Sequence, residues 1–143
     1  MRIFSAAVAA LMCLSLSATA FAADIKLFTA DTAEAIATAA GGTDIQRKVS
    51  GDQTIIAFEY KGGRYIFSLE LCSKDDKSKC AALLMASGFR TTAGDTLEVI
   101  NNFNKAVGFL TAVKLDSETM AFGRYIVALG GISAENVGVS FGL

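Results

Sequence analysis

Residues 55–89 decide the fold, and they read IIAFEYKGGRYIFSLELCSKDDKSKCAALLMASGF. Three apolar runs are separated here by a Gly-Gly pair and by a wholly polar loop. Apolar runs of this length, bounded by turn signals, are typical of β-strands joined by hairpins. We therefore predict a three-stranded antiparallel meander.

Two cysteines flank the polar loop and set the register of the second hairpin. If Cys72 faces Cys80, then Leu69 lies opposite Leu83, and the alternation of side chains along a strand puts these two leucines on one face. An even pair of cysteines in a small exported domain is more often a structural bridge than a reactive site. We therefore predict a disulfide between Cys72 and Cys80.

The Gly62-Gly63 pair gives an independent register for the first hairpin, because glycine accepts positive φ at low cost. With these two residues as the turn, Tyr60 faces Tyr65 and Phe58 faces Phe67. Both registers bury the same face, which we predict to comprise Ile56, Phe58, Tyr60, Tyr65, Phe67, Leu69, Leu71, Leu83 and Met85.

The flanking segments predict further elements. The pattern from Asp31 to Glu34 matches a capping box, so we expect Asp31 to cap a helix at 32–40. A polar strand at 44–50 should lie at the edge of the sheet, where Arg47 discourages further pairing.

The second half of the chain predicts a helix at 94–107, a hairpin of 109–115 with 119–129, and a short final helix capped by Ser133. The apolar stripe of the helix should lie on the sheet and comprises Leu97, Ile100, Phe103 and Val107, with Phe103 over Phe58 and Phe67. The hairpin should point Phe109, Val113 and Leu115 inward. The expected fold class is α+β, an antiparallel sheet packed with two main helices and a short C-terminal helix.

Residues 1–22 have the pattern of a secretory signal peptide: a basic start, an apolar run and small residues ahead of the expected cleavage, which falls before Ala23. Lipid modification at Cys13 is disfavoured because Met12, which is not a small residue, precedes it. We expect a periplasmic or secreted protein whose residues 23–143 form one domain. No stretch after the signal reaches the roughly 18 apolar residues of a transmembrane helix.

Composition excludes several functions. The 143 residues have a formal net charge of -1 and no basic block, which argues against a nucleic-acid partner. The motif Gly138-Val139-Ser140-Phe141-Gly142 matches the nucleophile turn of α/β-hydrolases, but the chain has no His to complete a catalytic triad. We assign no catalytic residue, cofactor or metal ligand, and we do not expect an enzyme.

Two asparagines in the second predicted helix need an explanation, because Asn favours caps and turns over helix interiors. Asn104 lies in the same sector of the helix as the apolar stripe, and Asn101 lies at its border. Their amides either satisfy strand ends, which is the more common role of such groups, or form a polar interaction site.

Several motifs, taken in order, resemble the YbjN-domain family, which is labelled as bacterial sensory transduction regulators. The resemblance covers about residues 30–137 and is carried by Gly-Arg-Tyr-Ile-Phe at 63–67, the cysteine pair before 81–89, Ile-Asn-Asn-Phe-Asn at 100–104, the hairpin at 116–121 and Gly-Gly-Ile-Ser-Ala-Glu-Asn at 130–136. It implies a fold similar to type III secretion chaperones, and it does not imply an enzyme. This chain departs from the family in having Phe103 where Trp is common, and in a short C-terminal segment.

These patterns lead to two functional hypotheses. The first is an exported, non-enzymatic regulatory module that binds an unidentified protein or peptide. The alternative is a module that binds a small ligand or lipid in a pocket between the helix at 94–107 and the sheet. A large apolar cavity at that place would favour the alternative, and an exposed apolar patch would favour protein binding.

Overall fold

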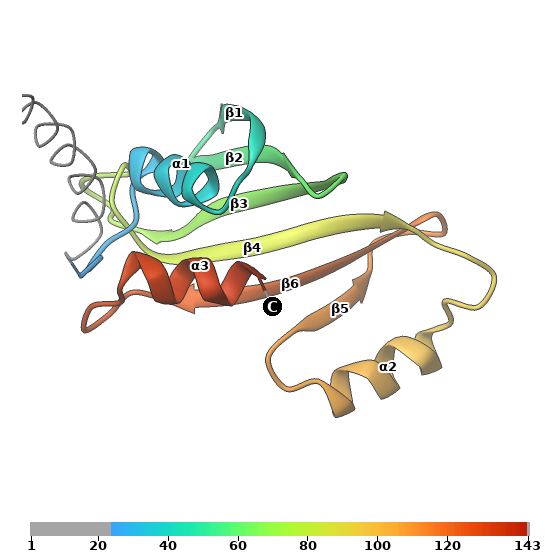
Figure 1. Ribbon diagram of the computed structural model, residues 1–143. Helices are drawn as coiled ribbons and strands as arrows, with labels where there is room; N and C mark the ends of the chain where they lie inside the picture. Colours follow the sequence, from blue (N-terminus) through green and yellow to red (C-terminus); the bar gives the residue numbers. More distant parts are fainter. Residues whose placement is uncertain (1–23, 143) are drawn as a thin grey trace, which may run out of the picture.

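The computed structural model describes residues 24–142 and shows a six-stranded antiparallel sheet with three helices (Figure 1), which confirms the expected α+β class. The strand order in the sheet is β1-β2-β3-β4-β6-β5. Along the chain the elements are α1 (Ala30–Ala39), β1 (Thr43–Ser50), β2 (Gln53–Tyr60), β3 (Gly63–Cys72), β4 (Cys80–Arg90), α2 (Leu97–Ala106), β5 (Thr111–Lys114), β6 (Thr119–Val127) and α3 (Ala134–Gly142). The predicted signal peptide and its cleavage site lie outside the described residues.

The hairpin of β3 and β4 has the predicted register. Cys72 lies opposite Cys80 and Leu69 opposite Leu83, and a disulfide joins the two cysteines. The prediction that Leu71 belongs to the core is wrong. Its φ of 54° interrupts the pairing of the strands and turns its side chain outward, where it is 69% exposed.

The predicted register of β2 with β3 is wrong by two residues. Tyr60 pairs with Gly63 and Phe58 with Tyr65, so the turn consists of Lys61 and Gly62. Both turn residues have positive φ, 47° and 77°, as a type I′ turn requires. A shift of two residues keeps every side chain on its predicted face, so the core face of this hairpin is as expected.

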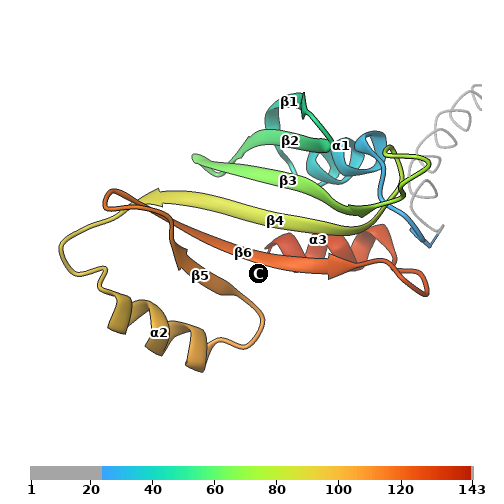
Figure 2. The same ribbon diagram turned by 180° about the vertical axis from the view of Figure 1, so that it is seen from behind.

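Helices α1 and α3 cover one face of the sheet, as Figures 1 and 2 show from opposite sides. Phe141 of α3 packs against the aromatic rings of this face, with ring centroids 5.4 Å from Phe58 and 5.6 Å from Phe67. Its centroid also lies 4.9 Å from that of Tyr60 and 5.2 Å from that of Tyr65. The C-terminal helix therefore supplies the ring that closes the main core.

The prediction that the second helix covers Phe58 and Phe67 is wrong. Helix α2 lies at the other end of the molecule beside β5, and Phe103 packs against Phe122 with ring centroids 5.2 Å apart. Of its stripe, Ile100 is buried, but Leu97 is 66% exposed. The short loop from α2 into β5 holds the helix at this edge of the sheet, because the two elements follow each other directly along the chain.

The strand β5 has the opposite phase to the prediction. Phe109, Val113 and Leu115 are exposed, whereas Ala112 is buried. Ala112 pairs with Phe122, whose side chain contacts α2, so alternation turns Val113 to the other face of the sheet.

The predicted cap of α1 is wrong, and the predicted cap of α3 is confirmed. Thr29 caps α1 by accepting a hydrogen bond from the Thr32 N–H at 3.1 Å, so the prediction of Asp31 as the cap is wrong. Asp31 instead forms an ion pair with Arg47 of the edge strand β1. Ser133 caps α3 as expected, with the Asn136 N–H donating to its hydroxyl oxygen at 3.1 Å, although the helix is longer than a single turn.

Candidate functional site

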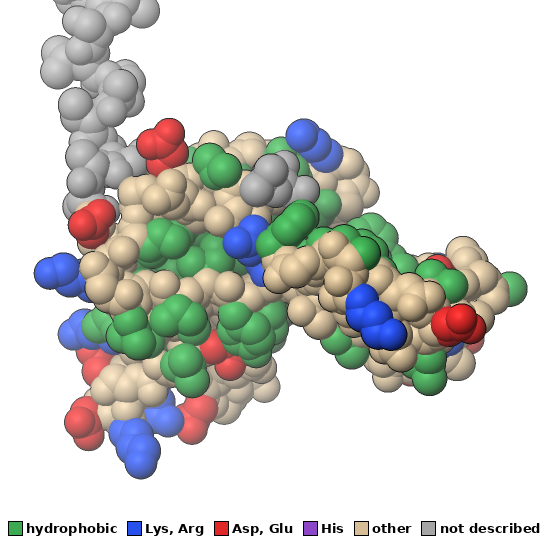
Figure 3. Space-filling model, turned by 90° about the horizontal axis from the view of Figure 1, so that it is seen from below, with side chains coloured by type: hydrophobic (Ala, Val, Ile, Leu, Met, Phe, Trp, Pro, Cys, Tyr) green, Lys and Arg blue, Asp and Glu red, His purple; other side chains and the backbone are tan. Residues whose placement is uncertain are grey.

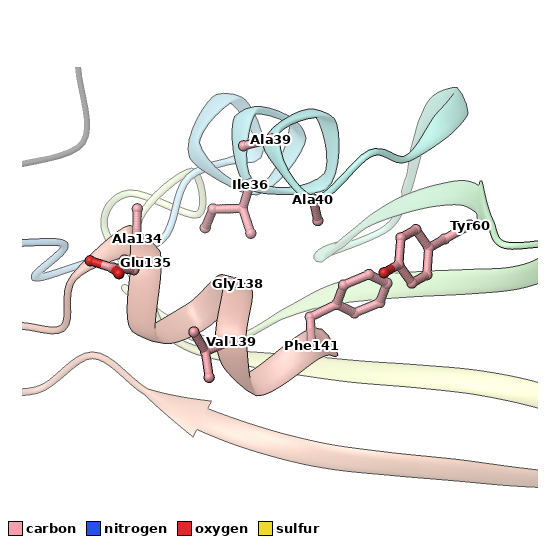
Figure 4. Close-up of a pocket in the computed structure, with 9 residues that line it drawn as sticks. All are labelled: Ile36, Ala39, Ala40, Tyr60, Ala134, Glu135, Gly138, Val139 and Phe141. Atoms are coloured by element: carbon pink, nitrogen blue, oxygen red, sulfur yellow. The ribbon is translucent and has the colours of Figure 1, made fainter. Parts of the chain in front are cut away.

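A groove of about 510 Å³ lies between α1 and α3 (Figure 4). Its walls are mostly small or aliphatic: Ile36, Ala39 and Ala40 from α1, Tyr60 from β2, and Ala134, Glu135, Gly138, Val139 and Phe141 from α3. The carboxylate of Glu135 and the hydroxyl of Tyr60 lie at opposite ends of the groove in Figure 4. These polar groups do not converge on one point, so the groove offers little to orient a ligand.

A second cavity of about 360 Å³, which we call the aromatic cavity, lies where α2 and the end of α3 leave a gap over the sheet. Six aromatic side chains contribute to its lining: Tyr65, Phe89, Phe103, Phe109, Phe122 and Phe141. Its position between the second helix and the sheet matches the pocket that the small-ligand hypothesis requires. The volume falls within the range of sites for small molecules.

Arg124 lines the aromatic cavity from β6, where it lies opposite Met85 of the core face. Its Nη1 donates a hydrogen bond to the carbonyl oxygen of Ser140 at 3.2 Å, whereas its Nε is buried without a partner. A buried guanidinium N–H that lacks an acceptor is unfavourable. The cavity therefore combines an apolar lining with one unsatisfied cationic donor.

Ser140 belongs to the G-x-S-x-G motif, which the structure places within α3. The nucleophile turn of a hydrolase needs a strand before the serine and a helix after it. Here the serine contributes its main-chain carbonyl oxygen to Arg124. The motif is part of the wall of the aromatic cavity, through Ser140 and Phe141.

The two asparagines of α2 have different surroundings. The Asn104 amide forms two hydrogen bonds with the main chain of Ala112: its Nδ2 donates to the carbonyl oxygen at 2.8 Å, and its Oδ1 accepts from the N–H at 2.7 Å. Asn104 therefore ties α2 to β5, as the structural interpretation expects. Asn101 lies exposed on the same helix, and an interaction role for either residue stays a prediction.

One edge of strand β6 is open over part of its length. Strand β5 pairs with β6 only up to Gly123, and Figures 1 and 2 show β6 continuing beyond it. The Ala128 N–H donates to the carbonyl of Ala81 on the β4 side, so strand alternation directs the N–H and C=O groups of Tyr125 and Val127 to the open side. Among residues 24–142, no other strand pairs there.

Apolar side chains flank this open edge. Tyr125 is 61% exposed and Val127 is 49% exposed, on the face of the sheet that α1 and α3 do not cover. Figure 3, which views the molecule from below, shows groups of hydrophobic side chains on this side of the molecule. By contrast, the edge strand β1 carries Arg47 and Lys48, the kind of residue that protects an edge from pairing.

Charged groups stabilise the loops outside these surfaces. The Lys79 ammonium and the Ser78 side-chain and main-chain donors lower the pKa of Asp76 to about 2. The Arg47 guanidinium lowers the pKa of Glu34 by donating to its carboxylate at 2.7 Å. These groups hold the loop of the disulfide hairpin and the contact between α1 and β1.

Residues 24–142 contain neither a group of metal ligands nor a membrane-spanning helix. In this range, no three His, Cys, Asp or Glu side chains are grouped so as to hold a metal ion. The helices of this range include none that is both long and apolar enough to cross a membrane.

Sequence reasoning missed the most distinctive residues of the aromatic cavity and the open edge. Arg124 has a signal in the sequence, because it is the one charged residue in the run from Met120 to Leu129. The open edge has no such signal, because it depends on where β5 ends relative to β6.

A family model and a solved structure match this chain. The family model described as "YbjN: Putative bacterial sensory transduction regulator" matches residues 29–143. The structure described as "Crystal structure of YbjN, a putative transcription regulator from E. coli" aligns with a TM-score of 0.49 and 9% sequence identity, over 82% of this chain and 90% of that chain. None of the curated proteins matches this chain in sequence.

Proposed function

This chain belongs to the YbjN family, and we propose that it is an exported, non-enzymatic regulatory module that binds an extended segment of a partner protein along the open edge of β6. The observation that carries the proposal is the pair of N–H and C=O groups that Tyr125 and Val127 direct away from β4. An extended peptide can satisfy such groups by adding a strand to the sheet.

The side chains beside the edge suggest what the partner segment looks like. Alternate residues of an added strand point to opposite faces of the sheet. On the open face they would meet the exposed side chains of Tyr125 and Val127, which favour apolar or aromatic partners. The partner segment we expect is short and extended, with apolar residues at every second position.

One feature of the sequence and one of the structure support export. The pattern of residues 1–22 is that of a signal peptide, and disulfides such as the one between Cys72 and Cys80 persist in oxidising compartments. The absence of His from the sequence supports a non-enzymatic role, because His is the most common general base.

The aromatic cavity favours a second candidate function, the binding of a small ligand. It is an apolar hollow with one cationic donor, a common composition of small-molecule sites. The two functions use different surfaces, because the Arg124 side chain lies on the core face, whereas the open edge is formed by main-chain groups of Tyr125 and Val127.

Proline scanning of the edge tests the main proposal. Val127→Pro removes the N–H that points to the open side but none of the hydrogen bonds to β4, and Val127→Thr is the control that keeps this N–H. Each form of the tagged mature chain is purified from its native envelope, and the retained proteins are identified by mass spectrometry. Thermal unfolding of each form verifies that it is folded.

We expect a partner that the unchanged chain and Val127→Thr retain and that Val127→Pro loses. Tyr125→Pro, with Tyr125→Thr as its control, repeats the comparison at the neighbouring outward N–H. A partner retained equally by folded proline variants, or no partner for the unchanged chain, would contradict the proposal.

A further inference from the structure

We infer that the aromatic cavity binds a small carboxylate with an apolar body, and that Arg124 receives the carboxylate. This inference rests on the second candidate function, and it does not depend on strand addition at β6. It assigns a ligand class to a cavity whose residues come from the sheet and from helices at both ends of the core face.

The lining of the cavity specifies an apolar ligand body. Phe122 forms the centre of a cluster, with ring centroids 5.5 Å from Phe89 and 5.2 Å from Phe103. Met85 and Leu110 add flexible apolar surface. Aromatic rings bind hydrocarbon chains and other rings, because the contact removes the apolar surface of the ring and of its partner from water.

Arg124 specifies the charge of the ligand. The Nε N–H is buried without an acceptor, and the neighbouring Nη1 reaches only a main-chain carbonyl oxygen. Among residues 24–142, the cations that form ion pairs are Arg47, Lys77 and Lys79. Arg124 forms no ion pair with a carboxylate of this range. A planar carboxylate matches the fork of a guanidinium and can accept from two of its N–H groups. Because the Nε atom is closed to solvent, the Arg124 side chain must turn to present it to a carboxylate in the cavity.

The other polar side chains that line the cavity are those of Tyr65, Ser87 and Ser140, and none of them carries a charge. The Ser87 hydroxyl donates to the carbonyl oxygen of Arg64 at 2.8 Å. Arg124 is therefore the group that can distinguish a charged ligand from a neutral one. A volume of about 360 Å³ suits a ligand with one chain or ring.

Two pairs of probes test the inference by isothermal titration calorimetry on the mature chain. Decanoate is compared with decanol, which has the same chain length without the charge, and 3-phenylpropanoate is compared with 3-phenylpropanol. The first pair reports an aliphatic ligand and the second an aromatic one. All four are used below the concentration at which they aggregate.

We expect at least one carboxylate to bind about tenfold or more tightly than its alcohol, the effect of a charge-assisted hydrogen bond. Arg124→Met should remove this preference and leave alcohol binding in place. Phe109→Ser, at the exposed rim, should weaken the acid and the alcohol alike, which verifies the site even if Arg124→Met does not fold.

The outcomes separate the inference from the function on which it rests. Equal binding of acids and alcohols would overturn the carboxylate assignment but keep the small-ligand function. Binding of none of the four probes would contradict both. An unchanged preference in folded Arg124→Met would place the carboxylate elsewhere and overturn the inference.

Discussion

Phe141→Ala is the substitution that most sharply tests how the core is closed. The ring contacts four aromatic side chains, with centroid distances of 4.9 to 5.6 Å, and it is partly buried. Truncation of a buried Phe costs roughly 3–5 kcal/mol, and we expect about 3 kcal/mol because part of this ring stays exposed. That is a large share of the roughly 5–15 kcal/mol by which small domains are stable.

Urea unfolding of the mature chain measures this loss. With a slope of about 2 kcal/mol per molar urea, a loss of 3 kcal/mol lowers the midpoint by about 1.5 M. Phe103→Ala is the matched control. It removes a ring that packs on Phe122 at the edge of the sheet, and we expect a loss of about 1 kcal/mol. A loss for Phe103→Ala as large as that for Phe141→Ala, or larger, would show that Phe141 is not the ring that closes the main core.

Three further predictions follow from single contacts. Cys72→Ser opens the hairpin disulfide and should lower the free energy of unfolding by roughly 2–3 kcal/mol, as urea titration can measure. Asn104→Ala leaves two main-chain groups of β5 unpaired and should lower the free energy of unfolding by about 1–3 kcal/mol. Asn101→Ala, at an exposed position of the same helix, should change it by no more than about 0.5 kcal/mol, and equal losses in the two variants would contradict the contact between Asn104 and Ala112. The pKa of Asp76 is about 2, below its ordinary value of 3.8, so the stabilising contribution of this carboxylate is present above pH 3.8 and is lost as the pH falls through 2. NMR titration should show the pKa of Asp76 rising in Lys79→Met, and an unchanged pKa would be inconsistent with the ion pair.

Local signals predicted the meander well because its register depends on nearby residues. The cysteines on either side of one short loop fixed β3 against β4. The Gly62-Gly63 pair was ambiguous, because Lys61 also adopts the positive φ that a type I′ turn needs. The error did not reach the core, because it amounted to two residues and the side-chain period of a strand is two.

Long-range packing was harder to predict. The stripe of α2 is apolar, but an apolar stripe does not say which apolar surface it covers, and Phe103 and Phe141 are chemically the same. The prediction that an aromatic ring of a helix covers Phe58 is therefore confirmed, but the ring is that of Phe141 in α3 and not that of Phe103 in α2. The open edge of β6 and the residues that line the aromatic cavity could not be predicted for the same reason, since each depends on where α2, β5 and α3 end in space.

Hydrogen exchange of the β6 amides reports whether the edge of this strand is open, and the measurement needs neither a partner nor a ligand. In the free mature chain, the amides of Arg124 and Ile126 donate toward β4 and should exchange slowly. The amides of Tyr125 and Val127 point to the open edge and should exchange rapidly under the same conditions. We expect NMR to show this alternation along four consecutive residues. Slow exchange at all four amides would show that the edge is already covered and would contradict the proposed binding of a partner strand.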